Sequence, residues 1–185
     1  MKPKPWTLLE SEYLIQDDWL KLRGDACRLP DGRIIRPYYV LEYPDWVHVV
    51  AITPAQELVL IQQYRHGTQE IILEIPGGVM DEADESPLAA AKRELREETG
   101  YGSETFQFLG DVNPNPASQT NTSHFFLATN ARLEAAQSLD ENEDIEVVLT
   151  PLSEVLDLMR KGVFRQTLNV SALFFALDRL GYVHA

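Results

Sequence analysis

Short runs of apolar and β-branched residues, separated by turn signals, fill most of the first eighty positions. Asp31-Gly32 is a typical hairpin turn between two such runs, and Pro44-Asp45 marks a boundary. The runs predict strands at 13–15, 20–24, 34–42, 46–53, 58–64 and 71–75. Later runs predict strands at 106–109, 122–129 and 145–149.

Helical periodicity is clearest after this strand-rich part. Ser86 can cap a helix, Pro87 suits its first turn and Gly100 can end it. A mostly apolar stripe on this helix consists of Leu88, Ala91, Leu95 and Thr99. Two more amphipathic helices are predicted at 153–161 and 168–180. Because strands occur before, between and after the helices without regular alternation, the sequence predicts a mixed α/β fold rather than a doubly wound parallel sheet.

Composition sets wide limits on the class of protein. The 185 residues suit one domain with a small appendage, and a hydrophobic content of 44% is ordinary for a globular core. No apolar run approaches the ~18 residues of a membrane span. The single Cys27 excludes an intrachain disulfide framework and a cysteine-based zinc site. We therefore expect a soluble, cytoplasmic protein.

Charge is concentrated in two short stretches. The chain has 16 Lys+Arg against 29 Asp+Glu, a formal net charge of −13, which argues against nucleic acid or an anionic membrane surface as a partner. Residues 81–104 contain eight acids and three bases, and residues 134–146 contain six acids and no base. Such stretches are either solvated surfaces or carboxylates gathered to hold divalent cations.

Three glutamates lie close together on the predicted helix. Glu94 is three residues from Glu97 and four from Glu98, so we expect all three on one face, opposite the apolar stripe. Like charges at this spacing destabilise a helix by ~0.2–0.5 kcal/mol per pair, and the helix dipole disfavours anions at this end. A bound cation would remove both penalties, and oxygen ligands suit Mg²⁺ or Mn²⁺. The alternative is a solvated face on which Lys92 and Arg96 are the partners.

The segment 77–101 resembles the Nudix box: glycine, five residues, glutamate, seven residues, then Arg-Glu-apolar-any-Glu-Glu-any-Gly-apolar. The positions that match in register are Glu85, Arg93, Glu94, Leu95, Glu97, Glu98, Gly100 and Tyr101. Six residues rather than five separate Gly78 from Glu85, which lengthens the loop without rotating the helical glutamates. So many fixed positions make a specific signal.

The resemblance implies a hydrolase of a nucleoside diphosphate linked to another moiety. It implies a Nudix fold, in which helices sandwich a mixed sheet. It also implies that Glu94, Glu97 and Glu98 bind Mg²⁺, with Mn²⁺ as a possible substitute, and that Gly77 or Gly78 brings a main-chain carbonyl to the metal. Arg93 is expected to pair with Glu85 and orient the loop, so Gly78, Glu85 and Gly100 are structural residues of the box and Arg93 and Glu97 catalytic ones.

Two further features resemble the ADP-ribose and nucleotide-sugar pyrophosphatases of this family. Pro116 lies 15 residues beyond Tyr101, as does the proline that marks these enzymes, although an ordinary loop proline is the alternative. Residues 140–145 resemble the mobile acidic loop that supplies the catalytic base, although a solvated turn is the alternative. Glu141 is preferred as the base by its position in the pattern, with Glu143 next.

The N-terminal part resembles the sheet through which these enzymes dimerise. We therefore predict a strand-rich extension over 1–45, a Nudix hydrolase domain over 46–185, and a homodimer. Trp46 could stack on adenine or belong to the core. Arg65 could clamp a phosphate or lie on the surface, since guanidinium fits phosphate bidentately.

The most specific hypothesis is Mg²⁺-dependent hydrolysis of the pyrophosphate bond of ADP-ribose or a related nucleotide sugar. Its products from ADP-ribose are AMP and ribose 5-phosphate. The first alternative keeps the chemistry but acts on GDP-mannose, NADH or a diadenosine polyphosphate. The second alternative is a regulator that binds a nucleotide sugar without turning it over.

Overall fold

The computed structural model describes residues 2–183, and the chain forms two compact units. The first contains the residues up to 44 together with 113–122, and the second contains 45–112 and the chain from 123 onward. The sequence analysis assigns 113–122 to the hydrolase domain, but this segment groups with the N-terminal unit. Hydrogen bonds hold it there: Leu41 N donates to Ser118 O at 2.7 Å and Thr120 N donates to Leu41 O at 3.3 Å.

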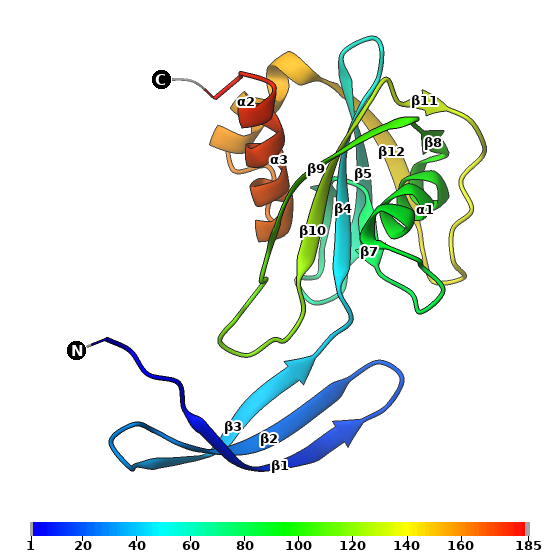
Figure 1. Ribbon diagram of the computed structural model, residues 1–185. Coiled ribbons are helices and arrows are strands. Elements are labelled where there is room, and N and C mark those ends of the chain that lie inside the picture. Colours follow the sequence, from blue (N-terminus) through cyan, green and yellow to red (C-terminus); the bar gives the residue numbers. More distant parts are fainter. Residues whose placement is uncertain (1, 184–185) are drawn as a thin grey trace. The chain divides into compact units, whose positions relative to one another are not determined.

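Strands β1 (Thr7–Gln16), β2 (Lys21–Arg28) and β3 (Ile34–Glu42) form an antiparallel sheet in the first unit, in the order β1-β2-β3 (Figure 1). The β2–β3 turn contains Gly32, whose φ of 89° favours glycine, as the Asp31-Gly32 signal predicts. Strand β1 is longer than the predicted 13–15 because pairing with β2 extends order to Thr7. The sheet leaves large side chains exposed, among them Trp19 at 88%, Leu8 at 56% and Tyr39 at 55%.

The second unit contains a mixed sheet between helices, which confirms the predicted fold class. Within its described residues, seven strands form this sheet: β12-β5-β4-β10-β9, with β6 beside β5 and β7 beside β4. Only β4 and β10 pair in parallel within these residues. The strands are β4 (Trp46–Ile52), β5 (Glu57–Arg65), β6 (Glu70–Glu74), β7 (Gly77–Val79), β9 (Thr105–Val112), β10 (Ser123–Thr129) and β12 (Ile145–Pro151). A separate pair is formed by β8 (Tyr101–Gly102) and β11 (Arg132–Leu133).

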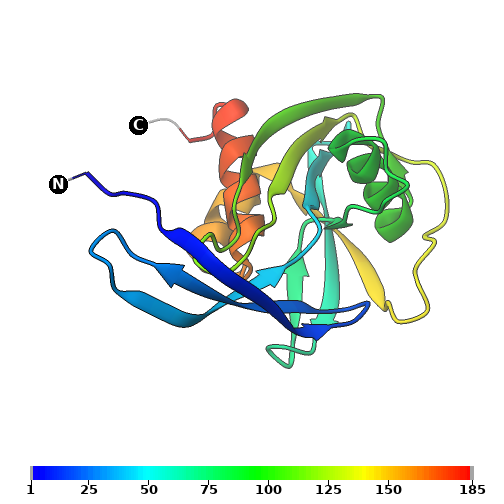
Figure 2. The same cartoon turned by 60° about the horizontal axis from the view of Figure 1, so that its bottom comes forward.

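Helices cover both faces of this sheet (Figures 1 and 2). Helix α1 (Pro87–Thr99) packs on one face over a core that includes Val47, Val49 and Leu95. Helices α2 (Leu152–Arg160) and α3 (Thr167–Arg179) pack on the other face over a second core, which includes Phe125 and Leu173. Alternating residues of a strand point to opposite faces, so β4 contributes to both cores. Within residues 2–183, no helix combines the length and apolar character needed to cross a membrane.

Helix α1 begins and ends at the residues its sequence signals predict. The Ser86 hydroxyl accepts a hydrogen bond from Ala89 N at 3.2 Å, and Pro87 opens the helix. Gly100 ends the helix in the left-handed region with φ 75°, and its N–H donates to Arg96 O at 2.8 Å. The first and last residues of α1 are therefore set by capping interactions within a few residues of each end.

Strand β7 is an element that the sequence analysis does not predict. Gly77 pairs with His48 on β4, and a Cβ on Gly77 would lie 2.2 Å from the Val47 carbonyl oxygen. No real side chain tolerates this distance, so only glycine lets this short strand approach β4. The consequence is that the main chain before α1 is held against the centre of the sheet.

Candidate active site

The glycine pair of β7 brings the main chain against two glutamates of α1. Gly77 N donates to Glu98 Oε2 at 2.7 Å. A Cβ on Gly78 would lie 2.6 Å from Glu94 Oε1, so the bare backbone touches that carboxylate. Both carboxylates are thereby gathered at one point between β7 and α1.

The sequence analysis places Glu98 on the face of the helix opposite the apolar stripe, and this prediction is wrong. Glu98 is buried, with 4% exposure. The physical reason is helical geometry. Glu98 lies seven residues after Ala91, close to two full turns, so it returns to the face of Ala91 and Leu95. Leu88, predicted to be apolar stripe, is instead 37% exposed. The inner face of α1 therefore carries a carboxylate at its C-terminal end.

Burial changes the protonation of this pair. Burial raises the pKa of Glu94 to about 7 and that of Glu98 to about 8. For Glu98, the charges of Glu94 and Glu143 add to the rise, and the Gly77 N–H opposes it. Two partly or fully buried carboxylates with raised pKa values fit a divalent cation, which would stabilise their ionised forms.

Glu97, the third glutamate of the predicted metal site, is held by Arg93. Within residues 2–183, no three carboxylate, imidazole or thiol groups already stand together at metal-binding spacing. Glu97 is instead bound by Arg93, whose Nη1 donates to Glu97 Oε2 at 3.0 Å and to Glu94 Oε1 at 2.9 Å. Glu97 is thus the neighbouring carboxylate that could join Glu94 and Glu98 around a cation.

Arg93 uses all five of its N–H donors, but its partner in the loop is Asp84 rather than the predicted Glu85. Its Nε and Nη2 bind the two Asp84 oxygens at 3.2 and 2.8 Å, and Nη2 also donates to Val79 O at 3.0 Å. Glu85 is exposed. The Arg93 guanidinium holds the pKa of Asp84 below its usual value, as expected for a charge-assisted bidentate pair.

The spacing of the box contains the signal that identifies Asp84. Five residues separate Gly78 from Asp84, which is the spacing of the family pattern, so the additional residue follows Asp84 instead of preceding it. The shorter aspartate reaches Arg93 because the Asp81–Asp84 turn is closed by a hydrogen bond from Asp84 N to Asp81 O at 3.0 Å. Relative to the family pattern, this chain therefore has one more residue between the Arg93 partner and the helix, and a shorter acidic side chain as that partner.

Replacing Asp84 by alanine is expected to destabilise the protein by about 1.5–3 kcal/mol, because it leaves Arg93 without its charged bidentate partner. Glu85→Ala is the matched control in the neighbouring exposed position, and we expect a change within about 0.5 kcal/mol. Urea unfolding of both variants followed by circular dichroism measures the difference. A larger loss in Glu85→Ala than in Asp84→Ala would return the Arg93 pairing to Glu85.

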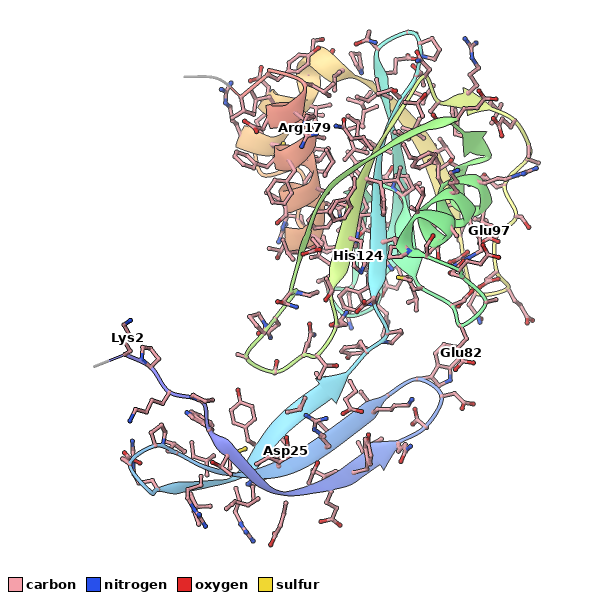
Figure 3. All side chains as sticks on the ribbon, viewed as in Figure 1. Lys2, Asp25, Glu82, Glu97, His124 and Arg179 are labelled. Atoms are coloured by element: carbon pink, nitrogen blue, oxygen red, sulfur yellow. The ribbon has the colours of Figure 1, made fainter. Side chains whose placement is uncertain are left out.

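The acidic loop before β12 lies beside α1, and Figure 3 shows Glu97 on the side of α1 that faces it. Ser138 N donates to Glu97 O at 2.9 Å. Asp140 N donates to Glu143 Oε2 at 3.0 Å, which orients that side chain. Burial is the main cause of the raised pKa values of Glu94 and Glu98, but the negative charge of Glu143 adds to both. Glu141 is exposed, and the choice between Glu143 and Glu141 as the base stays a prediction.

Arg65 ends β5 and is anchored by a buried acid that the sequence analysis does not identify. Its Nε donates to Glu74 Oε2 at 2.8 Å, and the Glu74 side chain is 2% exposed against 43% for Arg65. Glu74 Oε1 is buried without a hydrogen-bond partner among the described residues. Although burial dominates and raises the pKa of Glu98, the Arg65 charge opposes that rise, which places Arg65 near the glutamates. The available signal was a lone charge within the apolar run 71–75.

Trp46 and Pro116 are the two other predicted substrate-binding residues. Trp46 opens β4 and is half-buried against the core under α2 and α3, the face opposite α1. This packing favours the core interpretation of Trp46. Pro116 belongs to the segment 113–122, which groups with the first unit. Its contribution to substrate binding stays a prediction.

Two known protein families match this chain. The NUDIX domain matches residues 43–169, and the nucleoside diphosphate sugar hydrolase N-terminal domain matches residues 6–41. The chain belongs to the Nudix family. It is a Nudix hydrolase of the branch that carries this additional N-terminal domain.

Individual relatives cover most of the chain. An ADP compounds hydrolase NudE of Escherichia coli (strain K12) is 32% identical over 79% of this chain and 78% of that protein. A methanol dehydrogenase activator of Bacillus methanolicus is 30% identical over 83% and 82%, and an ADP-ribose pyrophosphatase of Mycobacterium tuberculosis is 29% identical over 89% and 80%. A crystal structure of an ADP compounds hydrolase matches with a TM-score of 0.86 and 28% identity, covering 99% of this chain and 100% of the other.

Proposed function

We propose that this protein hydrolyses the pyrophosphate bond of ADP-ribose or a related nucleotide sugar, with Mg²⁺ as cofactor. The observation that carries the proposal is the pair formed by the partly buried Glu94 and the buried Glu98, which Gly77 and Gly78 gather beside β7. The charge of Glu143 in the acidic loop acts on both carboxylates. Relatives named ADP-ribose pyrophosphatase, ADP compounds hydrolase and GDP-mannose pyrophosphatase support the substrate class.

Charge explains why such a site needs a cation. A pyrophosphate is an anion, and it would be repelled by the carboxylates of α1 unless a cation stood between them. Glu94, Glu98 and the Gly77 carbonyl would hold Mg²⁺, with Glu97 as the additional ligand and Mn²⁺ as a substitute. When bound, the ion supplies charge stabilisation at the attacked phosphorus and lowers the pKa of water.

The protein's own groups then have distinct tasks. Arg93 holds the Asp81–Asp84 turn against α1 and so orients the glutamates. Glu143 accepts the proton of the attacking water, which is a task for a carboxylate on a loop that can close over substrate. Arg65, fixed through its Nε by Glu74, has its two Nη groups available for a phosphate of the substrate.

A substrate panel tests the proposal. We expect purified protein with Mg²⁺ to release AMP and ribose 5-phosphate from ADP-ribose, detected by chromatography, and to lose activity when EDTA is added. The panel includes GDP-mannose, NADH and diadenosine polyphosphates, and relative kcat/KM values rank them. Absence of any nucleoside monophosphate across the panel would refute the proposed activity.

A non-catalytic regulator is the second candidate, and a relative named methanol dehydrogenase activator is the observation that favours it. Calorimetry distinguishes the two functions. Tight ADP-ribose binding without release of AMP would support the regulator, whereas binding with turnover supports the enzyme.

We also propose that the protein is a cytoplasmic homodimer. The first unit exposes Trp19, Leu8 and Tyr39, and a three-stranded sheet with so much apolar surface gains stability when a second subunit covers it. Sedimentation of the full chain measures its mass in solution.

A further inference from the structure

One amide group ties both ends of the acidic loop to the helix that carries the candidate metal ligands. Gln137 Nε2 donates to Glu98 O at 2.6 Å and to Ile145 O at 3.1 Å. The nitrogen of a side-chain amide carries two N–H donors, and both are used here. Ile145 begins β12, so Gln137 joins the start of that strand to the C-terminal end of α1.

Neighbouring hydrogen bonds also attach the chain just before the loop, residues 134–138, to the end of α1. Glu134 N and Ala135 N both donate to Gly100 O, at 2.9 and 3.2 Å, and Ser138 N donates to Glu97 O at 2.9 Å. The carbonyl groups at the end of a helix have no partners within it, so the loop satisfies acceptors that would otherwise need water. From 134 to 138, the chain therefore follows the end of the helix closely.

Only seven residues, 138–144, lie between the two attachments. They include four acids: Asp140, Glu141, Glu143 and Asp144. Because Gln137 binds the carbonyl of Glu98, one residue carries both a carboxylate of the candidate metal site and an attachment point of the loop. The ends of the loop are therefore attached to Glu98, the residue beside which the Glu143 carboxylate has to act.

We propose that Gln137 is a positioning residue, whose amide holds the ends of the loop 138–144 on α1 so that Glu143 is directed to Glu94 and Glu98. This inference rests on the proposed function, since it assigns the delivery of the catalytic base to a residue outside the box. Gln137 touches neither substrate nor metal in this role. Its exposure also means that a substitution leaves the core intact.

Gln137→Met tests the inference because methionine keeps the length and shape of the side chain but removes both donors. Hydrogen exchange followed by mass spectrometry is the first readout. We expect the amides of 138–144 to exchange at least about fivefold faster than in the parent protein, with α1 unchanged. Gln107→Met, at an exposed glutamine of β9, is the matched control and should leave exchange in the loop unaltered.

Steady-state kinetics are the second readout. For Gln137→Met we expect kcat to fall about tenfold or more, with KM and the Mg²⁺ concentration for half activity changed less than about twofold. A purely structural role would not separate kcat from KM in this way. Unchanged exchange in the loop overturns the inference, and so does faster exchange with an unchanged kcat. A parent protein that is inactive on the whole substrate panel would instead refute the proposed function, and the exchange measurement would still decide whether Gln137 holds the loop.

Discussion

Replacing Glu98 by glutamine is expected to lower kcat by about two orders of magnitude or more and to weaken the dependence of the activity on Mg²⁺. Residues that support metal ligands only indirectly already cost about 10–100-fold when changed, so loss of a direct ligand should cost at least as much. Glutamine keeps the shape of the side chain, and its carbonyl oxygen can still accept the hydrogen bond from Gly77 N.

Although Glu98→Gln lowers activity, it is expected to raise the stability of the metal-free protein at high pH. The folded-state pKa of Glu98 is raised by burial to about 8, and that of Glu94 to about 7, above the ordinary value of 4.5. The folded protein therefore binds protons more tightly than the unfolded chain, and its stability falls as the pH rises from about 4.5 to 8. Glu98→Gln removes one of the two groups responsible.

Urea unfolding in EDTA at pH 5 and pH 8 measures this effect. We expect Glu98→Gln to be more stable than the parent protein at pH 8 and nearly equal to it at pH 5, and we expect added Mg²⁺ to stabilise only the parent protein. Glu104→Gln is the control at an exposed glutamate outside the site. Near-full activity in Glu98→Gln would remove Glu98 from the metal site.

Glu143→Gln is expected to lower kcat by about 10²–10⁴-fold, the usual effect of losing a general base, with little change in KM. Glutamine can still accept the hydrogen bond from Asp140 N, so the loop keeps its local structure. Only the capacity to take up a proton is lost.

Glu141→Gln is the matched variant for this experiment because it removes an equal charge from the same loop, two residues away. We expect it to retain most of its kcat, since the negative charge of Glu143 adds to the raised pKa values of Glu94 and Glu98. Kinetics of both variants with ADP-ribose decide between them. A larger loss in Glu141→Gln would assign the base to Glu141, as its position in the family pattern suggests.

Elements with local signals could be predicted from the sequence alone. Helix α1 begins after Ser86 and ends at Gly100 because capping chemistry is encoded within a few residues of each end. Strands β4, β5, β10 and β12 follow from their apolar runs. Strand β7 could not be predicted in this way, since its two glycines have no strand propensity and it exists only because β4 accepts them at close range.

The Nudix box predicts the wrong partner for Arg93 because the loop before α1 differs in length by one residue. Matching the box from the helix side selects Glu85, whereas counting from Gly78 selects Asp84. Both counts are consistent with the sequence. The structure chooses Asp84 because the turn from Asp81 aims its carboxylate at the guanidinium.

By itself, the sequence determined the family, the class of fold and the helix that carries Glu94, Glu97 and Glu98, because all of these rest on local spacing and periodicity. Only the tertiary structure decided how deeply Glu98 is buried, which acid pairs with Arg93, which loop glutamate approaches the pair, and that Glu74 and Gln137 belong to the surroundings of the site. These facts depend on contacts between residues distant in the chain, such as Gly77 with Glu98 and Gln137 with Glu98. Burial and charge at such contacts set pKa values and reach, and neither quantity is written in the spacing of a motif.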